Sequence, residues 1–265
     1  MKWETITSLE KTGRLPQPGE TLPDDDYVIG SHLVTSDEHG RFVDLKAWGA
    51  VLGLVDEFDF KSFTFNGDLL DFYELSRYEK DPDVEQCISV DIEAGRRLIE
   101  DVRARFKGPI HFNPGNHEER YERYLRGEAK ALKHYECLAL GSEENLRFEE
   151  LEVTSHDEKG FILGEEDRVY HGEVVRADPG ASAKGEFLAW GTGGTSGHVH
   201  RLGVYHANGS RIRSWAESGC LCVLCPEYSK KPVNWQHGLT IGHELASGEV
   251  VWELVRIVNG RIIRA

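Results

Sequence analysis

The feature that most constrains this chain is a series of acidic, amide and imidazole side chains, each placed just after a short apolar or alternating stretch. These residues are Asp37, His39, Asp68, Asn116, His117, His171, His198 and His200. The stretches before them, such as S-F-T-F-N at 62–66 and P-I-H-F-N at 109–113, predict strands. Because open α/β sheets hold ligands in the loops that follow their strands, we expect these side chains to meet in one site.

The pattern between these loops predicts an α/β fold in which strand, loop and helix alternate. Helices are expected over about 44–57, 71–80, 91–106 and 180–190, and a broken helix over 116–140 that stops near Gly127. Strands are expected near 32–36, 146–153, 160–163 and 167–171 and, after His200, in short segments that include 220–224, 237–243 and 250–258. Residues 1–28 are rich in Pro, Gly and Asp and predict an irregular arm, whereas residues 29–265 are expected to form a single domain.

Composition narrows the class of protein. The 265 residues are 39% hydrophobic, enough for a globular core, and 31 basic against 46 acidic residues give a net charge of −15. No long run of Lys and Arg is present, which disfavours a grip on the backbone of duplex DNA. The odd count of five cysteines, and the lack of an apolar signal core or of a stretch of about 18 apolar residues, predict a cytoplasmic protein with no membrane partner.

The polar side chains suit two divalent cations. Asp68 stands alone on a Gly-Asp turn, where its two carboxylate oxygens can bridge both ions. Asp37, His39 and His200 then complete one ion site, and Asn116, His171 and His198 complete the other. Residues i and i+2 of an extended or tightly turned segment lie on one side, so the doublets 37/39 and 198/200 each present two ligands to one cavity. Ions about 3.5 to 4 Å apart can share a hydroxide, and that hydroxide is a nucleophile for phosphate esters.

His117 has a different expected role. Its neighbour Asn116 is the better oxygen ligand for a cation, so the imidazole is left to donate a proton to the leaving alkoxide. An imidazole with a pKa near about 6.5 suits that role. Asp71 is the expected acid that sustains its protonation.

Taken in order, the motifs resemble those of a known family. D-x-H at 37–39, G-D-x-x-D at 67–71, G-N-H-E at 115–118, H-G at 171–172 and G-H-x-H at 197–200 are similar to the motifs of the calcineurin-like metallophosphoesterase superfamily. The resemblance covers roughly residues 31–202, and the stretch from 215–222 to 234–238 is similar to phage-encoded members. It implies a four-layer αββα sandwich with two mixed sheets flanked by helices. It also implies two metal ions on the seven ligands assigned above, with His117 as general acid; Mn²⁺ is expected, and Fe, Zn²⁺, Ni²⁺ and Mg²⁺ are the other candidates.

One position departs from the protein Ser/Thr phosphatase branch of that superfamily. Where that branch carries an Arg that clamps a dianionic phosphate, directly after the second Asp of G-D-x-x-D, this chain has Phe72. The expected function is therefore a metal-dependent phosphodiesterase acting on nucleotide or nucleic-acid phosphodiesters. A nuclease or a small-molecule phosphomonoesterase is the alternative, and a non-catalytic, metal-stabilised binding module is a more distant one. The sequence leaves the substrate, the native metal and the oligomeric state open.

The remaining cysteines and histidines carry weaker signals. Cys220, Cys222 and Cys225 fit alternation on a buried strand better than a zinc site, because a fourth ligand is not evident. Trp235 and His237 either line the mouth of the pocket or anchor a C-terminal loop. Six further histidines are expected to be structural or exposed: His32, His111, His134, His156, His206 and His243.

Overall fold

The computed structural model describes residues 27–76, 87–207, 209, 211, 213–224 and 233–263. The predicted arm over 1–28 lies outside the described residues except for Tyr27 and Val28, and Val28 already begins the first strand. Within the described ranges, no helix combines the length and the apolar character that a membrane span requires.

The strands of the described residues form two mixed sheets. In the larger sheet, β1 (Val28–Thr35), β2 (Ser62–Asn66), β3 (Ile110–Asn113) and β4 (Val153–Ser155) run parallel, and β10 (Gly238–Leu245), β11 (Val250–Val258) and β12 (Arg261–Ile263) extend the β1 edge in antiparallel pairs. In the smaller sheet, β6 (Asp167–Val169), β7 (Gly194–Ser196) and β9 (Ser214–Ser218) run parallel between the antiparallel edge strands β5 (Phe161–Leu163) and β8 (Leu202–His206).

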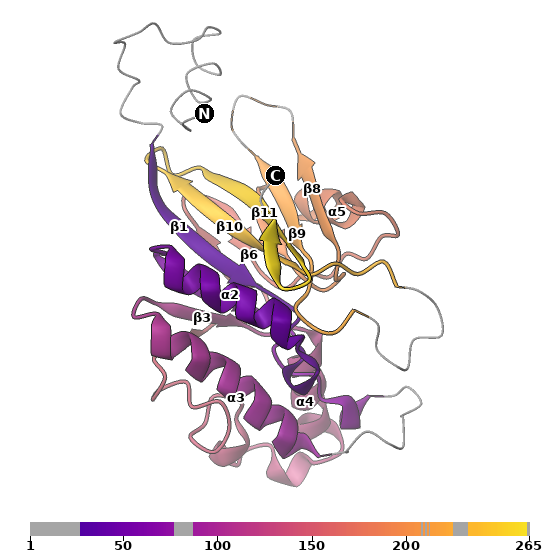
Figure 1. The fold of residues 1–265 in the computed structure, drawn as a ribbon. Helices are drawn as coiled ribbons and strands as arrows, with labels where there is room; N and C mark the ends of the chain where they lie inside the picture. Colours follow the sequence, from indigo (N-terminus) through magenta and orange to yellow (C-terminus); the bar gives the residue numbers. More distant parts are fainter. Residues whose placement is uncertain are drawn as a thin grey trace, which may run out of the picture.

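Helices cover the outer face of each sheet (Figure 1). The α-helices are α2 (Leu45–Glu57), α3 (Ile88–Arg105), α4 (Asn116–Gly127) and α5 (Ala181–Trp190), and the short 3-10 turns are η2 (Gly40–Phe42), η3 (Tyr73–Leu75), η4 (Lys130–Leu132) and η5 (Glu136–Leu138). Apolar residues of α2 and α3 join the core of the larger sheet, while α5 packs on Trp215 of the smaller sheet. The layers follow the order helix, sheet, sheet, helix, so the fold is the αββα sandwich that the motifs implied.

Alternation along the strands divides their side chains between two layers. In β2, Phe63 and Phe65 belong to the core under α2 and α3, whereas Asn66 faces the smaller sheet, where its side-chain amide donates to Tyr170 O at 2.9 Å. Asn113 of β3 donates to Asn66 Oδ1 at 2.7 Å and to Val169 O at 3.0 Å. These buried amides join the two sheets at the strand ends where the polar motifs begin.

The helices start where the sequence provides caps and apolar faces. Asp44 precedes α2 and accepts hydrogen bonds from Lys46 N and Ala47 N at 2.9 and 3.0 Å, which satisfies two N–H groups that a helix start leaves unpaired. Trp48 then stacks on Phe65 of β2 with ring centroids 6.3 Å apart. The burial of that aromatic pair fixes α2 against the larger sheet.

Three segments differ from the sequence expectations. Over 71–76 only the turn η3 forms in place of a helix, because the buried carboxylate of Asp91 binds the backbone N–H groups of residues 71 and 72; 77–80 lie outside the described residues. Residues 146–152 form turns, and the strand starts only at 153. Residues 220–224 make isolated bridges rather than a strand, since the N–H groups of 221 and 222 both bond Asp37 O in the first motif loop.

Candidate metal centre

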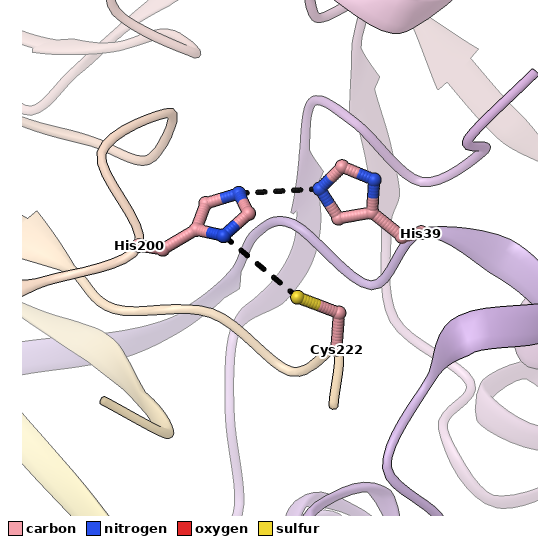
Figure 2. Close-up of side chains that lie close together, drawn as sticks. All are labelled: His39, His200 and Cys222. Atoms are coloured by element: carbon pink, nitrogen blue, oxygen red, sulfur yellow. Dashed lines mark hydrogen bonds between the residues drawn. The ribbon is translucent and has the colours of Figure 1, made fainter. Parts of the chain in front are cut away.

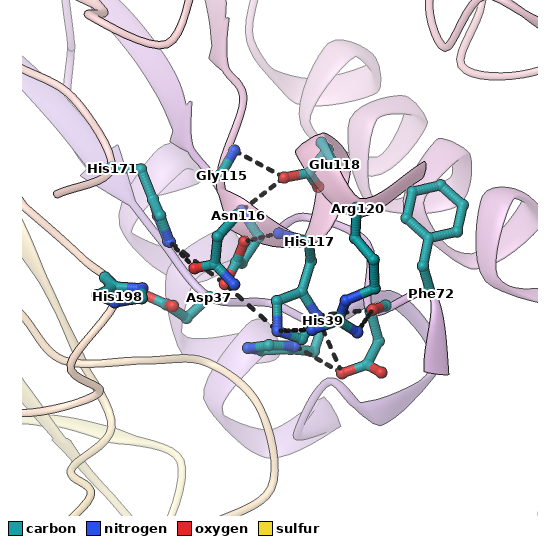
Figure 3. Close-up of polar contacts among 12 residues, drawn as sticks. Asp37, His39, Phe72, Gly115, Asn116, His117, Glu118, Arg120, His171 and His198 are labelled. Carbon is teal, nitrogen blue, oxygen red and sulfur yellow. Dashed lines mark hydrogen bonds and ion pairs between the residues drawn. The ribbon is translucent and has the colours of Figure 1, made fainter. Parts of the chain in front are cut away.

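The sequence-predicted site residues all follow the carboxyl ends of strands. Asp37 and His39 follow β1, Asp68 follows β2, Asn116 and His117 follow β3, His171 follows β6, and His198 and His200 follow β7. Strands β1 to β3 are parallel neighbours in one sheet, and β6 and β7 are parallel neighbours in the other. Their loops therefore meet at one edge of the sandwich, as Figure 3 shows for most of these side chains.

The loops hold five of these residues in the left-handed backbone region. Their φ angles are 57° at Asp37, 54° at His39, 53° at Asp68, 68° at His198 and 57° at His200. Residues other than glycine rarely adopt this conformation, and each instance costs on the order of 1 to 3 kcal/mol that the surrounding structure must offset. The doublets 37/39 and 198/200 therefore lie in tight turns. Their i, i+2 spacing is compatible with either an extended segment or a tight turn.

Asp37, His39 and His200 form a first group of ligand atoms. His39 Nε2 and His200 Nε2 lie 3.2 Å apart, and His200 Nε2 lies 3.0 Å from Asp37 Oδ1. The other ring nitrogens are engaged, because His39 Nδ1 donates to Asp71 Oδ2 at 2.7 Å and His200 Nδ1 lies 3.8 Å from Cys222 Sγ (Figure 2). Asp37 Oδ1 is buried and has no hydrogen bond of acceptable geometry among the described residues. The ligand atoms of His39, His200 and Cys222 all lie within 4.8 Å of one another, and Asp37 Oδ1 lies beside His200, so this group offers donors that suit a cation.

Asp68, Asn116, His171 and His198 form a second group. His171 Nε2 lies 3.2 Å from Asp68 Oδ2 and 3.3 Å from Asn116 Oδ1, while its Nδ1 donates to Asn66 O at 3.0 Å. The rings of His171 and His198 have centroids 5.2 Å apart. Ligand atoms of Asp68, His171 and His198 all lie within 4.8 Å of one another, so this group can also hold a metal ion.

Asp68 lies within reach of both groups. Its ligand atom is also within 4.8 Å of those of His39 and His117. The Oδ1 atom accepts a hydrogen bond from His117 N at 2.9 Å, while Oδ2 lies 3.2 Å from His171 Nε2. A Cβ atom on Gly115 would stand 2.2 Å from Asp68 Oδ1, so this approach requires glycine.

Opposite charges in the site shift the pKa values of its acids and imidazoles. Burial raises the pKa of Asp37, but the charge of His200, its hydrogen bond and the charge of His171 together lower it to about 2. Burial also raises the pKa of Asp68, yet His117 and His171 hold it well below its usual value. Burial lowers the pKa of His171, but Asp68 raises it to about 10; burial lowers that of His200, but Asp37 raises it to about 9. Protons on these imidazoles therefore balance the carboxylates in the metal-free protein, and binding of a cation would release them.

His117 sits beside both groups with one nitrogen fixed. Its Nδ1 donates to the backbone carbonyl oxygen of Asp71 at 2.6 Å, and its Nε2 lies 3.8 Å from Asp68 Oδ2. The Asp71 carboxylate binds His39 instead and stays 3.6 Å from His117 Nδ1. Burial lowers the pKa of His117 to about 4. Asp71 therefore orients the ring through its carbonyl group, and the charge of its carboxylate raises the pKa of His117, as expected, but by less than burial lowers it.

Sequence reasoning missed two buried acids that hold the loops of the site. Glu118 accepts hydrogen bonds at 2.9, 2.8 and 2.8 Å from three backbone N–H groups, those of Asp68, Leu70 and Gly115. Asp91 accepts them from the N–H groups of residues 71 and 72. Glu118 stands inside the G-N-H-E motif and was visible there, whereas Asp91 lies in α3 without any local signal.

Residues of the segment 222–237 lie beside the first group of ligand atoms. The ring centroid of Trp235 lies 4.3 Å from that of His200, with 62° between the planes, so this indole borders the site. His237 is buried and donates from Nε2 to Cys222 O at 2.8 Å, so it anchors the segment. Cys222 does more than pack, because its sulfur contacts His200; Cys225 lies outside the described residues.

A pocket of about 260 Å³ opens beside the second group. Its lining includes the candidate ligands Asn116, His171 and His198 and the acidic residues Glu119, Glu158 and Glu173. A bound cation would add positive charge at the ligands, while the glutamates repel anions.

Comparison with known proteins agrees with this geometry. A family model described as calcineurin-like phosphoesterase matches residues 31–217. The Gene 54 protein of Mycobacterium phage L5 is 28% identical over 251 residues, covering 86% of this chain and 94% of that protein. The Gene 54 protein of Mycobacterium phage D29 is 29% identical over 244 residues, with the same coverage of 86% and 94%. Among solved structures, a Vps29 single mutant from Entamoeba histolytica is similar with a TM-score of 0.49 and 12% identity, over 89% of this chain and 97% of that one.

Proposed function

The chain belongs to the calcineurin-like phosphoesterase family, and from this premise we propose that it is a two-metal phosphodiesterase acting on nucleotide or nucleic-acid phosphodiesters. The observation that carries the proposal is the position of Asp68, which has a ligand atom within 4.8 Å of those of His171 and His198 and a ligand atom within 4.8 Å of that of His39. Each group combines carboxylate oxygen with imidazole nitrogen, a donor set that suits Mn²⁺, Fe or Zn²⁺, and Mn²⁺ is the ion we propose.

The residues fit two ions. We assign one ion to Asp37, His39, Asp68 and His200, and the other to Asp68, Asn116, His171 and His198. Two distances support this fit: the Nε2 atoms of His39 and His200 lie 3.2 Å apart, and His200 Nε2 lies 3.0 Å from the buried Asp37 Oδ1. Bound there, two divalent cations would lower the pKa of a water and offset negative charge on the phosphoryl oxygens.

The proton for the leaving group is assigned to His117. Its Nδ1 is held by Asp71 O, so the ring can donate only from Nε2, the nitrogen that faces Asp68. Burial keeps the pKa of His117 at about 4 in the substrate-free protein. A negative phosphoryl group beside Nε2 opposes that effect, because it favours the charged imidazolium.

A small diester fits the surroundings better than a duplex. Phe72 is buried and stacks on Tyr121 with centroids 4.8 Å apart, so position 72 supplies no guanidinium for a dianionic phosphate. The carboxylates of Glu158 and Glu173 on the pocket wall repel a polyanion. A nuclease is therefore the second candidate function. We limit it to strand ends or single strands, which can reach the ions past Glu158 and Glu173.

The proposal is tested by metal content and turnover together. Protein loaded with Mn²⁺ should bind two ions per chain by elemental analysis and should hydrolyse bis-p-nitrophenyl phosphate. Asp68→Asn removes the oxygen donor shared by both groups, so it should lose at least one ion and lower the rate by about 100-fold or more. His206→Ala is the matched control, since this histidine is exposed on β8. Fewer than one ion per chain together with no turnover by the wild-type protein would refute the proposal.

Substrate comparison separates the remaining alternatives. A phosphodiesterase should cleave a cyclic dinucleotide faster than duplex DNA, whereas a nuclease should prefer DNA, and a monoesterase should prefer p-nitrophenyl phosphate. A non-catalytic module would bind the metal and cleave none of these. His117→Ala should keep both ions and lose about 100- to 10,000-fold in rate, because it removes only the proton donor.

A further inference from the structure

Arg120 brings a guanidinium to the candidate metal centre from a helix. It lies on α4, three residues after His117, so both side chains cover the same face of the helix. Its Nη2 atom lies 3.2 Å from His117 Nε2, and its Nη1 donates to Asp71 O at 3.2 Å. Figure 3 shows the guanidinium pointing toward His117 and His39, while the ring of Phe72 is turned away from them.

The partners of Arg120 differ from those of the other arginines on α4. Arg123 and Arg126 form ion pairs with glutamates one turn earlier, at 3.8 and 3.3 Å, on the exposed side of the helix. Arg120 is half-buried and instead contacts a carbonyl oxygen and an imidazole nitrogen, both uncharged while the imidazole is neutral. No ion pair joins Arg120 to a carboxylate of the described residues, and a guanidinium without such a partner favours an anionic ligand beside it.

The position of that ligand follows from His117. Its Nε2 lies 3.8 Å from Asp68 Oδ2 and 3.2 Å from Arg120 Nη2, so it stands between the shared carboxylate and the guanidinium. An oxygen that contacts Nε2 from the site is therefore within reach of Arg120 as well. Position 72 adds no competing cation, because Phe72 is fully buried against Tyr121.

We propose that Arg120 is the phosphate-binding guanidinium of this site and that it donates to a non-bridging oxygen of the phosphoryl group next to His117. Its charge-assisted hydrogen bonds are strongest with a dianion, so it extends the substrate class from diesters to phosphomonoesters and to the phosphate product. The substrate side of this inference rests on the proposed phosphoesterase function. The binding of inorganic phosphate by Arg120 does not depend on turnover.

The first test measures phosphate binding to the Mn²⁺-loaded protein by calorimetry. Arg120→Ala should raise the Kd of inorganic phosphate by about 10- to 100-fold, and Arg120→Lys should recover part of that loss because it keeps the charge without the forked donors. Arg126→Ala is the control, since that exposed arginine faces away from the site. Metal content and melting temperature of each variant establish that the centre and the fold are intact. An unchanged phosphate Kd in an intact, fully loaded Arg120→Ala protein would overturn the assignment.

The second test concerns specificity. In Arg120→Ala, kcat/KM should fall about tenfold more for p-nitrophenyl phosphate, a dianion, than for bis-p-nitrophenyl phosphate, a monoanion. Equal losses for the two esters would overturn the role of Arg120 in setting substrate class. If the wild-type protein cleaves neither ester, the proposed function fails, while the phosphate titration still decides whether Arg120 binds the anion.

Discussion

Asp167 is a buried acid that lies away from the metal centre, between the two sheets. It is the first residue of β6, and its Oδ1 accepts a hydrogen bond from the indole Nε1 of Trp252 on β11 at 2.9 Å. Burial raises the pKa of this carboxyl from 3.8 to about 7. One donor is therefore too little to offset the loss of water around a carboxylate, and the folded protein holds the neutral acid more readily than the unfolded chain does.

This shift predicts a pH-dependent stability. Between the unfolded pKa of 3.8 and the folded pKa of about 7, the folded state binds more protons, so the free energy of unfolding falls as pH rises through that window. Asp167→Asn keeps the acceptor for Trp252 and has no charge to bury. We expect it to stabilise the protein by on the order of 1 to 3 kcal/mol at about pH 8 and by less at about pH 5, measured by urea unfolding. The exposed Asp59→Asn should show no such gain, and an equal effect of Asp167→Asn at both pH values would contradict the prediction.

At the scale of elements, the side chain of Glu118 joins α4 to the loop after β2. Glu118 lies in the first turn of α4, and its carboxylate accepts hydrogen bonds from backbone N–H groups of Asp68 and Leu70 in that loop, as well as from Gly115 before the helix. The same residue thus caps the helix and fixes the turn that carries the shared candidate ligand. Loss of Glu118 would separate two elements that position the site.

We therefore predict that Glu118→Ala is strongly destabilising. It leaves buried backbone N–H groups without acceptors, at about 1 to 3 kcal/mol each, so the free energy of unfolding should fall by about 3 to 5 kcal/mol in total. Its neighbour Glu119 is exposed and pairs only with Arg123, so Glu119→Ala should change stability by less than about 0.5 kcal/mol. Thermal melting and Mn²⁺ titration check both variants. A Glu118→Ala protein as stable as Glu119→Ala would show that water or a backbone shift replaces the carboxylate.

The elements also show what local sequence can predict. The strands before Asp68 and Asn116 alternate apolar and polar residues, so both the strands and the placement of ligands at their ends could be read from a few neighbouring positions. The segment 220–224 alternates as well, yet its N–H groups bond the loop of Asp37, a partner more than 180 residues earlier in the chain, as the contacts of 221 and 222 with residue 37 show. Such pairings depend on the assembled fold. The contact of Arg120 with His117 is easier to predict from the sequence, because residues three apart on a helix lie on the same face.

At the scale of the whole molecule, the charge of the protein opposes its proposed substrates. The net charge is −15, and the lining of the pocket beside His171 includes Glu158 and Glu173. Arg120 and two bound cations would make only the floor of the site positive. An anionic ester must therefore cross a region of like charge before it reaches the site, and this barrier is long-range and sensitive to salt.

The balance of these fields predicts an unusual dependence on ionic strength. For the monoanion bis-p-nitrophenyl phosphate, kcat/KM should rise about two- to fivefold between about 20 and about 200 mM salt. The reason is that screening weakens the long-range repulsion by Glu158 and Glu173 more than it weakens the short-range contacts at the metal centre. The double variant Glu158→Gln/Glu173→Gln should start from a higher value at low salt and respond less. Proteins that steer anions through a basic groove behave in the opposite way, losing rate as salt rises. A fall in kcat/KM with salt in the wild-type protein would therefore indicate that the cations and Arg120 dominate the field at the entrance, and it would restore a nucleic-acid strand as the favoured substrate.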